Sequence, residues 1–186
     1  MFVLGIDPGL SRCGYGLVGR KEGEGRLRAQ AAGVLETDPA LPLADRLLVL
    51  HRELHSLLEE MRPQAVVVER VFFQVNAKTA MSVGQASGLA LMAAAAAGCE
   101  VAQYTANEVK QALVGYGAAT KEQVRRMVEQ VLLIEPLQGP PDVADALALA
   151  VCHLTTVPLR RAVGAALAEQ GGKSNVTEIR SMRRQP

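Results

Sequence analysis

The chain has 186 residues, of which 49% are hydrophobic and 21% are charged, and its 20 basic and 19 acidic residues give a net charge of +1. This length corresponds to about one domain with a core of its own, and this composition excludes a chain that is disordered throughout. The balanced charge gives no indication of a nucleic-acid partner, so evidence for one must come from where the charges lie.

No stretch of the sequence approaches the roughly 20 apolar residues that span a bilayer. The N-terminal residues 1–4 lack the basic region of a signal peptide, and the three cysteines form no CxxC pair. We therefore expect a cytoplasmic protein without a membrane segment, in which the cysteines are reduced and mostly buried.

Short apolar or β-branched runs, bounded by Gly, Pro or charged residues, predict five strands, over residues 2–6, 13–19, 26–36, 65–68 and 100–104. The first three follow one another as a meander. Leucines at steps of three and four between Leu43 and Met61 then predict a long amphipathic helix, which ends before Pro63. The run at 65–68 is apolar at every position, which is typical of a central strand covered on both faces.

Three further helices are predicted between residues 77 and 139. Residues 77–97 are rich in small helix-forming side chains. Thr105 and Glu108 have the spacing of a capping box, and so do Thr120 and Gln123, which marks the start of a helix at each place.

Pro140 and Pro141 precede a last predicted helix over residues 142–153, since proline fits the first helical turn, where its missing N–H is not needed. After Pro158 the chain carries six basic and two acidic residues and few β-branched or aromatic ones. We predict one folded domain over residues 1–157 and a basic, flexible tail over 158–186. The order of strands and helices predicts the α/β class, with one sheet between helices.

Four acids stand out by their positions in these elements. Asp7 and Glu69 each follow a buried strand, which is where open α/β sheets place their sites. Asp142 and Asp145 lie three residues apart on an otherwise apolar helix, so both can face one partner. Taken singly, each acid also fits an ordinary structural role, as a turn residue, a strand-end residue, a residue at a helix start or a surface charge.

Four converging carboxylates would repel one another and have raised pKa values. A hard cation that prefers oxygen ligands, such as Mg²⁺, removes this repulsion. Two such ions, roughly 3.5–4 Å apart, can activate water and stabilise the leaving oxygen in phosphodiester hydrolysis. The acids therefore indicate a two-metal nuclease.

Five segments, in order and in register, are similar to the RuvC family of Holliday-junction resolvases. They are Gly5–Gly9 (GIDPG), Val68–Phe72 (VERVF), Gly84–Gly88 (GQASG), Val109–Gln111 (VKQ) and Asp142–Ala148 (DVADALA). The resemblance covers about residues 1–155, and the combination of the first and last segments makes it specific.

This resemblance implies an RNase H-like fold, with a five-stranded mixed sheet flanked by helices on both faces, and a homodimer. It implies that Asp7, Glu69, Asp142 and Asp145 are the catalytic and metal-binding residues, holding two Mg²⁺ ions per subunit with Mn²⁺ as the alternative ion. The implied reaction resolves four-way DNA junctions by paired nicks that leave 5′-phosphate and 3′-hydroxyl ends. The implied partners are junction DNA and the RuvA–RuvB branch-migration complex.

Three further residues are candidates for DNA binding. Lys110 and Lys121 lie near the starts of two helices, and they are either solvated or in contact with phosphate, the role that the resemblance implies. Phe72 and Phe73 follow Glu69, and one of them is expected in the core. The other would lie in a loop at the edge of the site, where an aromatic ring can stack on an unpaired base. The resemblance favours Phe72 for this role.

Three other functions are weighed against this hypothesis. An RNase H-like scaffold also hosts nucleases that act on RNA, because fold does not fix function. A nucleotide-binding module of the actin or sugar-kinase type needs two such domains, and the sequence contains no G-x-x-x-x-G-K-[ST] motif. A catalytically inactive DNA-binding scaffold is disfavoured because four acids without metal would repel phosphates.

Overall fold

The computed structural model describes residues 1–20, 25–70 and 77–157. Its centre is a five-stranded sheet of order β3-β2-β1-β4-β5. The strands are β1 (Phe2–Asp7), β2 (Arg12–Arg20), β3 (Leu27–Glu36), β4 (Ala65–Glu69) and β5 (Glu100–Tyr104). The β1, β2 and β3 strands are antiparallel neighbours, whereas β4 runs parallel to β1 and to β5. The sheet is therefore mixed, and the five predicted strands are confirmed to within one residue at each end.

The helices are α1 (Leu43–Met61), α2 (Ala77–Ala96), α3 (Ala106–Val114), α4 (Lys121–Leu132) and a last helix over residues 141–157. Both predicted capping boxes are present, at the N-termini of α3 and α4. The last helix is longer than the predicted range 142–153. No helix in the described ranges is long and apolar enough to cross a membrane.

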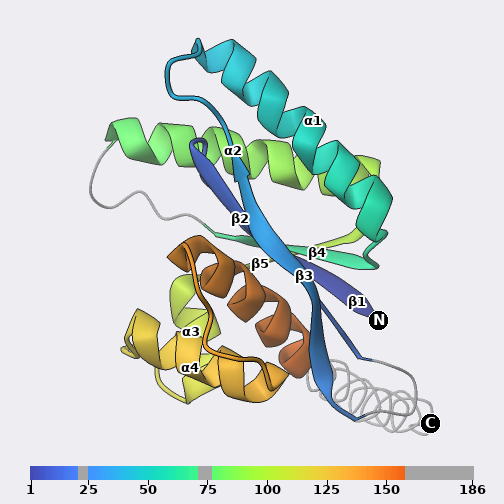
Figure 1. Cartoon of the computed structure of the whole chain (residues 1–186), viewed down its shortest axis with the longest axis vertical. Helices are drawn as coiled ribbons and strands as arrows, with labels where there is room; N and C mark the ends of the chain where they lie inside the picture. The colour runs from blue at the N-terminus through green and yellow to red at the C-terminus, as the bar shows by residue number, and fades with distance from the viewer. Residues whose placement is uncertain (21–24, 71–76, 158–186) are drawn as a thin grey trace, which may run out of the picture. The chain divides into compact units, whose positions relative to one another are not determined.

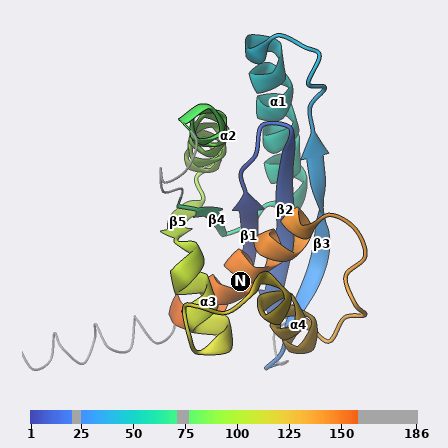
Figure 2. The same cartoon turned by 90° about the vertical axis from the view of Figure 1, so that its left-hand side faces the viewer.

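Helices cover both faces of the sheet, as predicted (Figures 1 and 2). On one face, α1 and α2 pack on a core that includes Leu4 and Val66. On the other face, α3, α4 and the 141–157 helix pack on a core that includes Val3 and Val67. Because successive strand residues point to opposite faces, Asp7 and Glu69 project on the same face as Val3 and Val67.

The 141–157 helix lies directly on the backbone of β1 and β2. A Cβ atom at Gly5 would overlap the carbonyl oxygen of Ala146, and one at Gly14 would overlap that of Asp142. Glycine at these two positions therefore permits a close approach between helix and sheet that any larger residue would prevent. This approach brings the acids of the helix to the ends of β1 and β4.

Candidate active site

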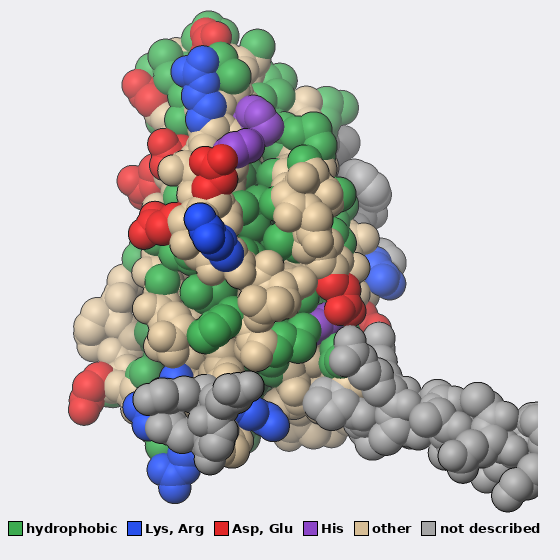
Figure 3. Space-filling view, turned by 90° about the vertical axis from the view of Figure 1, so that its right-hand side faces the viewer, with side chains coloured by type: hydrophobic (Ala, Val, Ile, Leu, Met, Phe, Trp, Pro, Cys, Tyr) green, Lys and Arg blue, Asp and Glu red, His purple; other side chains and the backbone are tan. Residues whose placement is uncertain are grey.

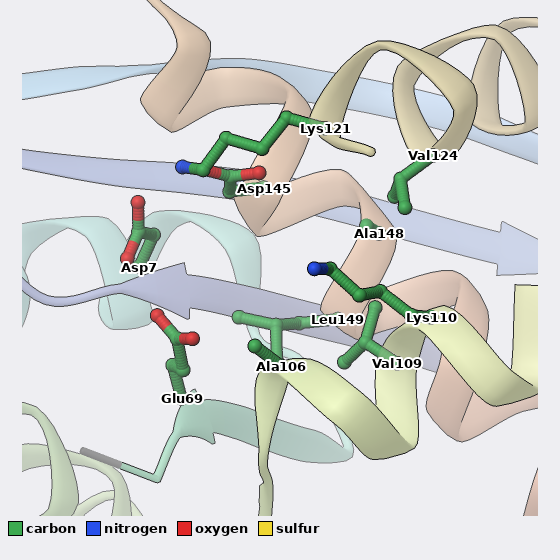
Figure 4. A pocket seen from close by; sticks show the side chains of 10 residues that line it. All are labelled: Asp7, Glu69, Ala106, Val109, Lys110, Lys121, Val124, Asp145, Ala148 and Leu149. Atoms are coloured by element: carbon green, nitrogen blue, oxygen red, sulfur yellow. The ribbon is translucent and has the colours of Figure 1, made fainter. Parts of the chain in front are cut away.

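Three acids and two lysines meet in one pocket at the end of β1 and β4 (Figure 4). Asp7 comes from β1, Glu69 from β4 and Asp145 from the 141–157 helix, whereas Lys110 and Lys121 come from α3 and α4. The rest of the lining is apolar and consists of Ala106, Val109, Val124, Ala148 and Leu149. Its volume of about 100 Å³ has room for ions and a few water molecules.

The pairing of β1 and β4 explains why Asp7 and Glu69 are neighbours. The two strands are parallel, and Ile6 lies opposite Val68, so each acid is the next residue at the same edge of the sheet. The carboxylates of Asp7 and Glu69 point into the pocket (Figure 4). Each acid thus lies at the end of a buried strand, as predicted, and the structure adds that the two strands are neighbours.

The closeness of the acids changes their protonation. Burial, followed by the negative charges of Glu69 and Asp145, raises the pKa of Asp7 from 3.8 to about 7. Burial also raises the pKa of Glu69; a hydrogen bond with Asp7 acts against this rise, and the charge of Asp145 adds to it. The charge of Lys121 acts in the opposite direction on both acids. The pocket thus concentrates negative charge that its own residues balance only in part.

Lys121 is in direct contact with one of these acids. Its Nζ atom donates a hydrogen bond to Oδ2 of Asp145 at 2.5 Å, and this bond is the main reason why the pKa of Lys121 is raised. Lys110 points into the same pocket from α3 (Figure 4). Lys110 forms no ion pair with any residue in the described ranges.

The fourth predicted acid, Asp142, lies beside this pocket and does not line it. Its backbone rests against Gly14, which is paired with Asp7 across β1 and β2. Nη2 of Arg12 lies 3.4 Å from Oδ2 of Asp142, which is an ion pair without hydrogen-bond geometry. This buried carboxylate oxygen accepts no hydrogen bond from the part of the chain that the structure describes.

A comparison with known proteins assigns this arrangement to a family. The family model "Crossover junction endodeoxyribonuclease RuvC" matches residues 3–153, which include all four acids and both lysines. The chain belongs to the RuvC family. The predicted resemblance is therefore confirmed.

Relatives of this RuvC-family chain match it over nearly their whole length. The crossover junction endodeoxyribonuclease RuvC of Syntrophomonas wolfei is 47% identical over 173 residues, which cover 93% of this chain and 99% of the relative. That of Moorella thermoacetica is 46% identical over 161 residues, covering 87% and 95%.

Solved structures agree with this assignment. Thermus thermophilus RuvC is 38% identical, with a TM-score of 0.78, and the match covers 86% of this chain and 96% of that one. The structure of T. thermophilus RuvC in complex with a Holliday junction substrate is 35% identical, with a TM-score of 0.76 and the same coverage. The RNase H-like fold that the resemblance implies is thereby confirmed.

The donor chemistry of the RuvC-family pocket fits a hard divalent cation. Carboxylate oxygens are the ligands that Mg²⁺ prefers. The pKa of Asp7 is raised by burial and by the neighbouring acids, and a buried oxygen of Asp142 accepts no hydrogen bond in the described ranges, so a cation would relieve both. Within the described ranges, no three acidic, His or Cys residues surround a common point closely enough to hold an ion together. A cation that binds Oδ2 of Asp145 would compete with the ammonium group of Lys121.

The thiol nearest the acids takes no part in nucleophilic chemistry. Cys13 is buried at the start of β2, and burial, together with the charges of Asp7 and Asp142, raises the pKa of its thiol to about 12. A thiol with such a pKa stays protonated at neutral pH, and only the thiolate is a good nucleophile. As predicted, the three cysteines are free; Cys13 and Cys152 are buried and Cys99 is partly buried.

Two features of the site were missed by the sequence analysis. Arg12 was not singled out as a partner of Asp142, and the glycines that seat the 141–157 helix were not identified. Gly5 and Gly14 inside predicted strands were the available signal, since such glycines often mark a close backbone approach. Phe72 and Phe73 lie outside the described residues.

Proposed function

We propose that this chain is a structure-selective endodeoxyribonuclease that resolves four-way DNA junctions in recombination and repair. The observation that carries this function is the meeting of Asp7, Glu69, Asp145 and two lysines in one pocket of a RuvC-family fold. The relatives compared above are named crossover junction endodeoxyribonucleases, and one of them has been solved with a Holliday junction. Since these names specify DNA, the RNA-directed alternative is not favoured.

The RuvC-family nuclease fold implies a divalent metal, and the ion proposed here is Mg²⁺, two per subunit, with Mn²⁺ as the alternative ion. Asp7, Glu69, Asp142 and Asp145 would hold these ions through their carboxylate oxygens. When bound, the ions supply an activated water and neutralise charge on the leaving oxygen. The apolar wall around Val109 and Leu149 limits the water around the acids, which strengthens their electrostatic interactions.

The lysines are the proposed phosphate contacts. Lys110 and Lys121 enter the pocket from two helices that begin close to it, so their ammonium groups can neutralise phosphates beside the acids. On the face seen in Figure 3, by contrast, basic and acidic side chains are interspersed over the part that is drawn in colour. Attraction of DNA is therefore assigned to local charges at the pocket and not to the net charge of +1.

Phe72 is the proposed stacking residue. It follows Glu69 by three residues, and a four-way junction can expose unstacked bases at its centre. Base–aromatic stacking is worth roughly 1–3 kcal/mol, so Phe72→Ala should lower the cleavage rate about tenfold to a hundredfold. The melting temperature should stay within about two degrees, because loss of a buried Phe would instead cost about 3–5 kcal/mol. A large fall in melting temperature would assign Phe72 to the core and favour Phe73.

The outer face of α2 is the proposed dimer surface. Met81 and Met92 are 66% and 49% exposed, and space is open beside Gly84 and Gly88. Lys78 is the only charged residue in the sequence of α2. An uncharged face with small residues allows two helices to approach closely, so the α2 helices of two subunits can pack together. A homodimer of this kind would place two active sites on one junction.

A charge on this face should separate the subunits. Met92→Glu should weaken the dimer about tenfold to a hundredfold, because burying an unpaired charge is costly. Sedimentation over a range of protein concentrations measures this change. Leu133→Glu is the matched control, since Leu133 is 67% exposed at the end of α4. An unchanged dimer in Met92→Glu, or equal weakening by both variants, would remove α2 from the interface.

The partner proposed from the family is the RuvA–RuvB branch-migration complex, and the proposed compartment is the cytoplasm, where the DNA substrate lies. Co-purification of the three proteins on junction DNA tests the partner. Failure of the complex to retain this chain on a junction that it binds would argue against the partnership.

A cleavage assay tests the function as a whole. A mobile four-way junction should be nicked at symmetric positions on two strands of like polarity, only with Mg²⁺ or Mn²⁺, while a duplex of the same sequence is left intact. The nicks should be sealed by DNA ligase without further treatment, because hydrolysis leaves 5′-phosphate and 3′-hydroxyl ends. Equal cutting of the duplex, or products that ligase cannot seal, would contradict the proposal.

A further inference from the structure

Lys121 and Asp145 are in contact in the structure, although the proposed function gives each of them a different partner. The proposed function gives the ammonium group of Lys121 to a DNA phosphate, and gives Asp145 to a metal ion. In the structure these two groups bind each other, with 2.5 Å between Nζ and Oδ2 (Figure 4). While this contact lasts, a phosphate must compete with Asp145 for the ammonium group, and a cation must compete with Lys121 for Oδ2.

The ammonium group of Lys121 acts on more than its hydrogen-bond partner. The charges of Asp145, Asp7 and Glu69 all stabilise its charged form, and its charge in turn stabilises the ionised carboxylates of Asp7 and Glu69. Lys121 thus neutralises the same three acids that a divalent cation would neutralise. A cation that binds Asp145 must compete with it.

The position of Lys121 allows this contact to break without a change in the fold. Its side chain is 75% exposed, and it is the first residue of α4, held by the capping box of Thr120 and Gln123. The capping interactions use the backbone of the helix start and do not involve the ammonium group. The Lys121 side chain can therefore leave Asp145 by rotation about its own bonds.

Lys110 provides an internal comparison. It lines the same pocket and carries the same charge, but it forms no ion pair with the acids in the described ranges. Its ammonium group therefore needs no release from an acid of the described ranges before it contacts a phosphate. Of the two lysines in the pocket, Lys121 is the one bound to a proposed metal ligand.

We infer that Lys121 is the resident counter-ion of the DNA-free site, which disfavours metal binding at Asp145 until a DNA phosphate draws Lys121 away. Metal and DNA then bind with positive coupling, because each of them releases the group that the other needs. This inference rests on the proposed function and adds to it a coupling between metal binding and DNA binding.

The first measurement is Mg²⁺ affinity without DNA, by calorimetric titration of the full-length protein. Lys121→Met keeps the aliphatic stem and removes the charge. It should bind Mg²⁺ about fivefold more tightly than the wild type. This factor corresponds to the upper end of the interaction free energies found for partly exposed ion pairs. Lys121→Arg should bind as the wild type does. Lys110→Met, which removes the same charge from the same pocket, should change the affinity less than about twofold.

The second measurement is the coupling itself. Affinity for a fluorescent four-way junction is measured in EDTA and in Ca²⁺, with denaturing gels to verify that the strands stay intact. The ratio of the two dissociation constants should be about fivefold smaller in Lys121→Met than in the wild type or in Lys110→Met, because coupling is reciprocal.

The results of these two measurements distinguish a failure of the role inferred for Lys121 from a failure of the proposed nuclease function. Equal Mg²⁺ affinities in the wild type and Lys121→Met, or equal gains in Lys121→Met and Lys110→Met, would overturn the role of Lys121 and leave the nuclease proposal intact. Absence of divalent-ion binding in every protein, with and without the junction, would overturn both.

Discussion

Replacing any of Asp7, Asp142 or Asp145 by Asn, or Glu69 by Gln, should lower junction cleavage by a factor of about 1,000 or more. This factor corresponds to the loss of about 4 kcal/mol of transition-state stabilisation. Each amide keeps the size of the acid but removes the charge that would hold a metal ion. Junction binding should survive or become tighter, because the substitution removes negative charge that repels phosphates.

Single-turnover cleavage and junction affinity are measured in parallel for each variant, with circular dichroism to verify the fold. Glu60→Gln is the matched control, since Glu60 is an exposed acid of α1 on the opposite face of the sheet. It should cut at the wild-type rate. A site variant that cuts nearly as fast as the wild type would remove that acid from the site, and loss of binding by all four variants would indicate a folding role.

Among the four acid variants, Asp142→Asn is the most informative. Asp142 lies outside the pocket that Asp7, Glu69 and Asp145 line, and its carboxylate faces Arg12 at 3.4 Å. If Asp142 serves the metal, Asp142→Asn loses cleavage with the other three. Full activity would show that its carboxylate serves only the ion pair with Arg12.

The sequence was sufficient to predict the parts of the site that depend on local pattern. Two parallel neighbouring strands bring Asp7 and Glu69 together, but the pairing of Ile6 with Val68 joins distant segments and was not predicted. A strand followed by an acid can be recognised locally, as both acids illustrate. The capping boxes at Thr105 and Thr120 were predictable for the same reason, since their spacing is local.

The parts that depend on contacts between distant segments were not predictable in this way. Asp142 and Asp145 could be placed on one helix, but their separation into one acid beside the pocket and one inside it depends on how that helix lies on β1 and β2. The contact of Lys121 with Asp145 joins residues 24 positions apart on two helices. The sequence contains charges of both signs, and only the fold determines which of them meet.

A second large effect, on both stability and cleavage, is expected for Gly5→Ala, because Gly5 lies directly against the 141–157 helix. The added Cβ atom would overlap the backbone carbonyl oxygen of Ala146, which cannot rotate away as a side chain can. The helix must therefore move off β1, at a cost of about 3 kcal/mol, the upper part of the usual range for overpacking. For a chain of this size the melting temperature should fall by roughly 6–12 °C.

The same displacement should reach the active site. Asp145 precedes Ala146 directly, so a shift of the helix moves this carboxylate relative to Asp7 and Glu69. A misplacement of about 1 Å can cost about a hundredfold in rate, so cleavage by the folded variant, measured well below its melting temperature, should fall by roughly that factor. Junction binding should fall much less, because Lys110 belongs to α3 and does not move with the 141–157 helix.

Two other glycines provide the controls for this prediction. Gly25→Ala should be neutral in stability and in cleavage, because nothing lies within 4 Å of its added Cβ atom. Gly16→Ala should have a smaller effect than Gly5→Ala, since its nearest contact would be the Leu147 side chain at 2.7 Å, whereas at Gly5 it is a backbone oxygen at 1.9 Å. Wild-type stability and cleavage in Gly5→Ala would contradict the close seating of the helix. A loss of stability with undiminished cleavage would show that Asp145 is positioned by the residues around it, and not by the contact of its helix with β1.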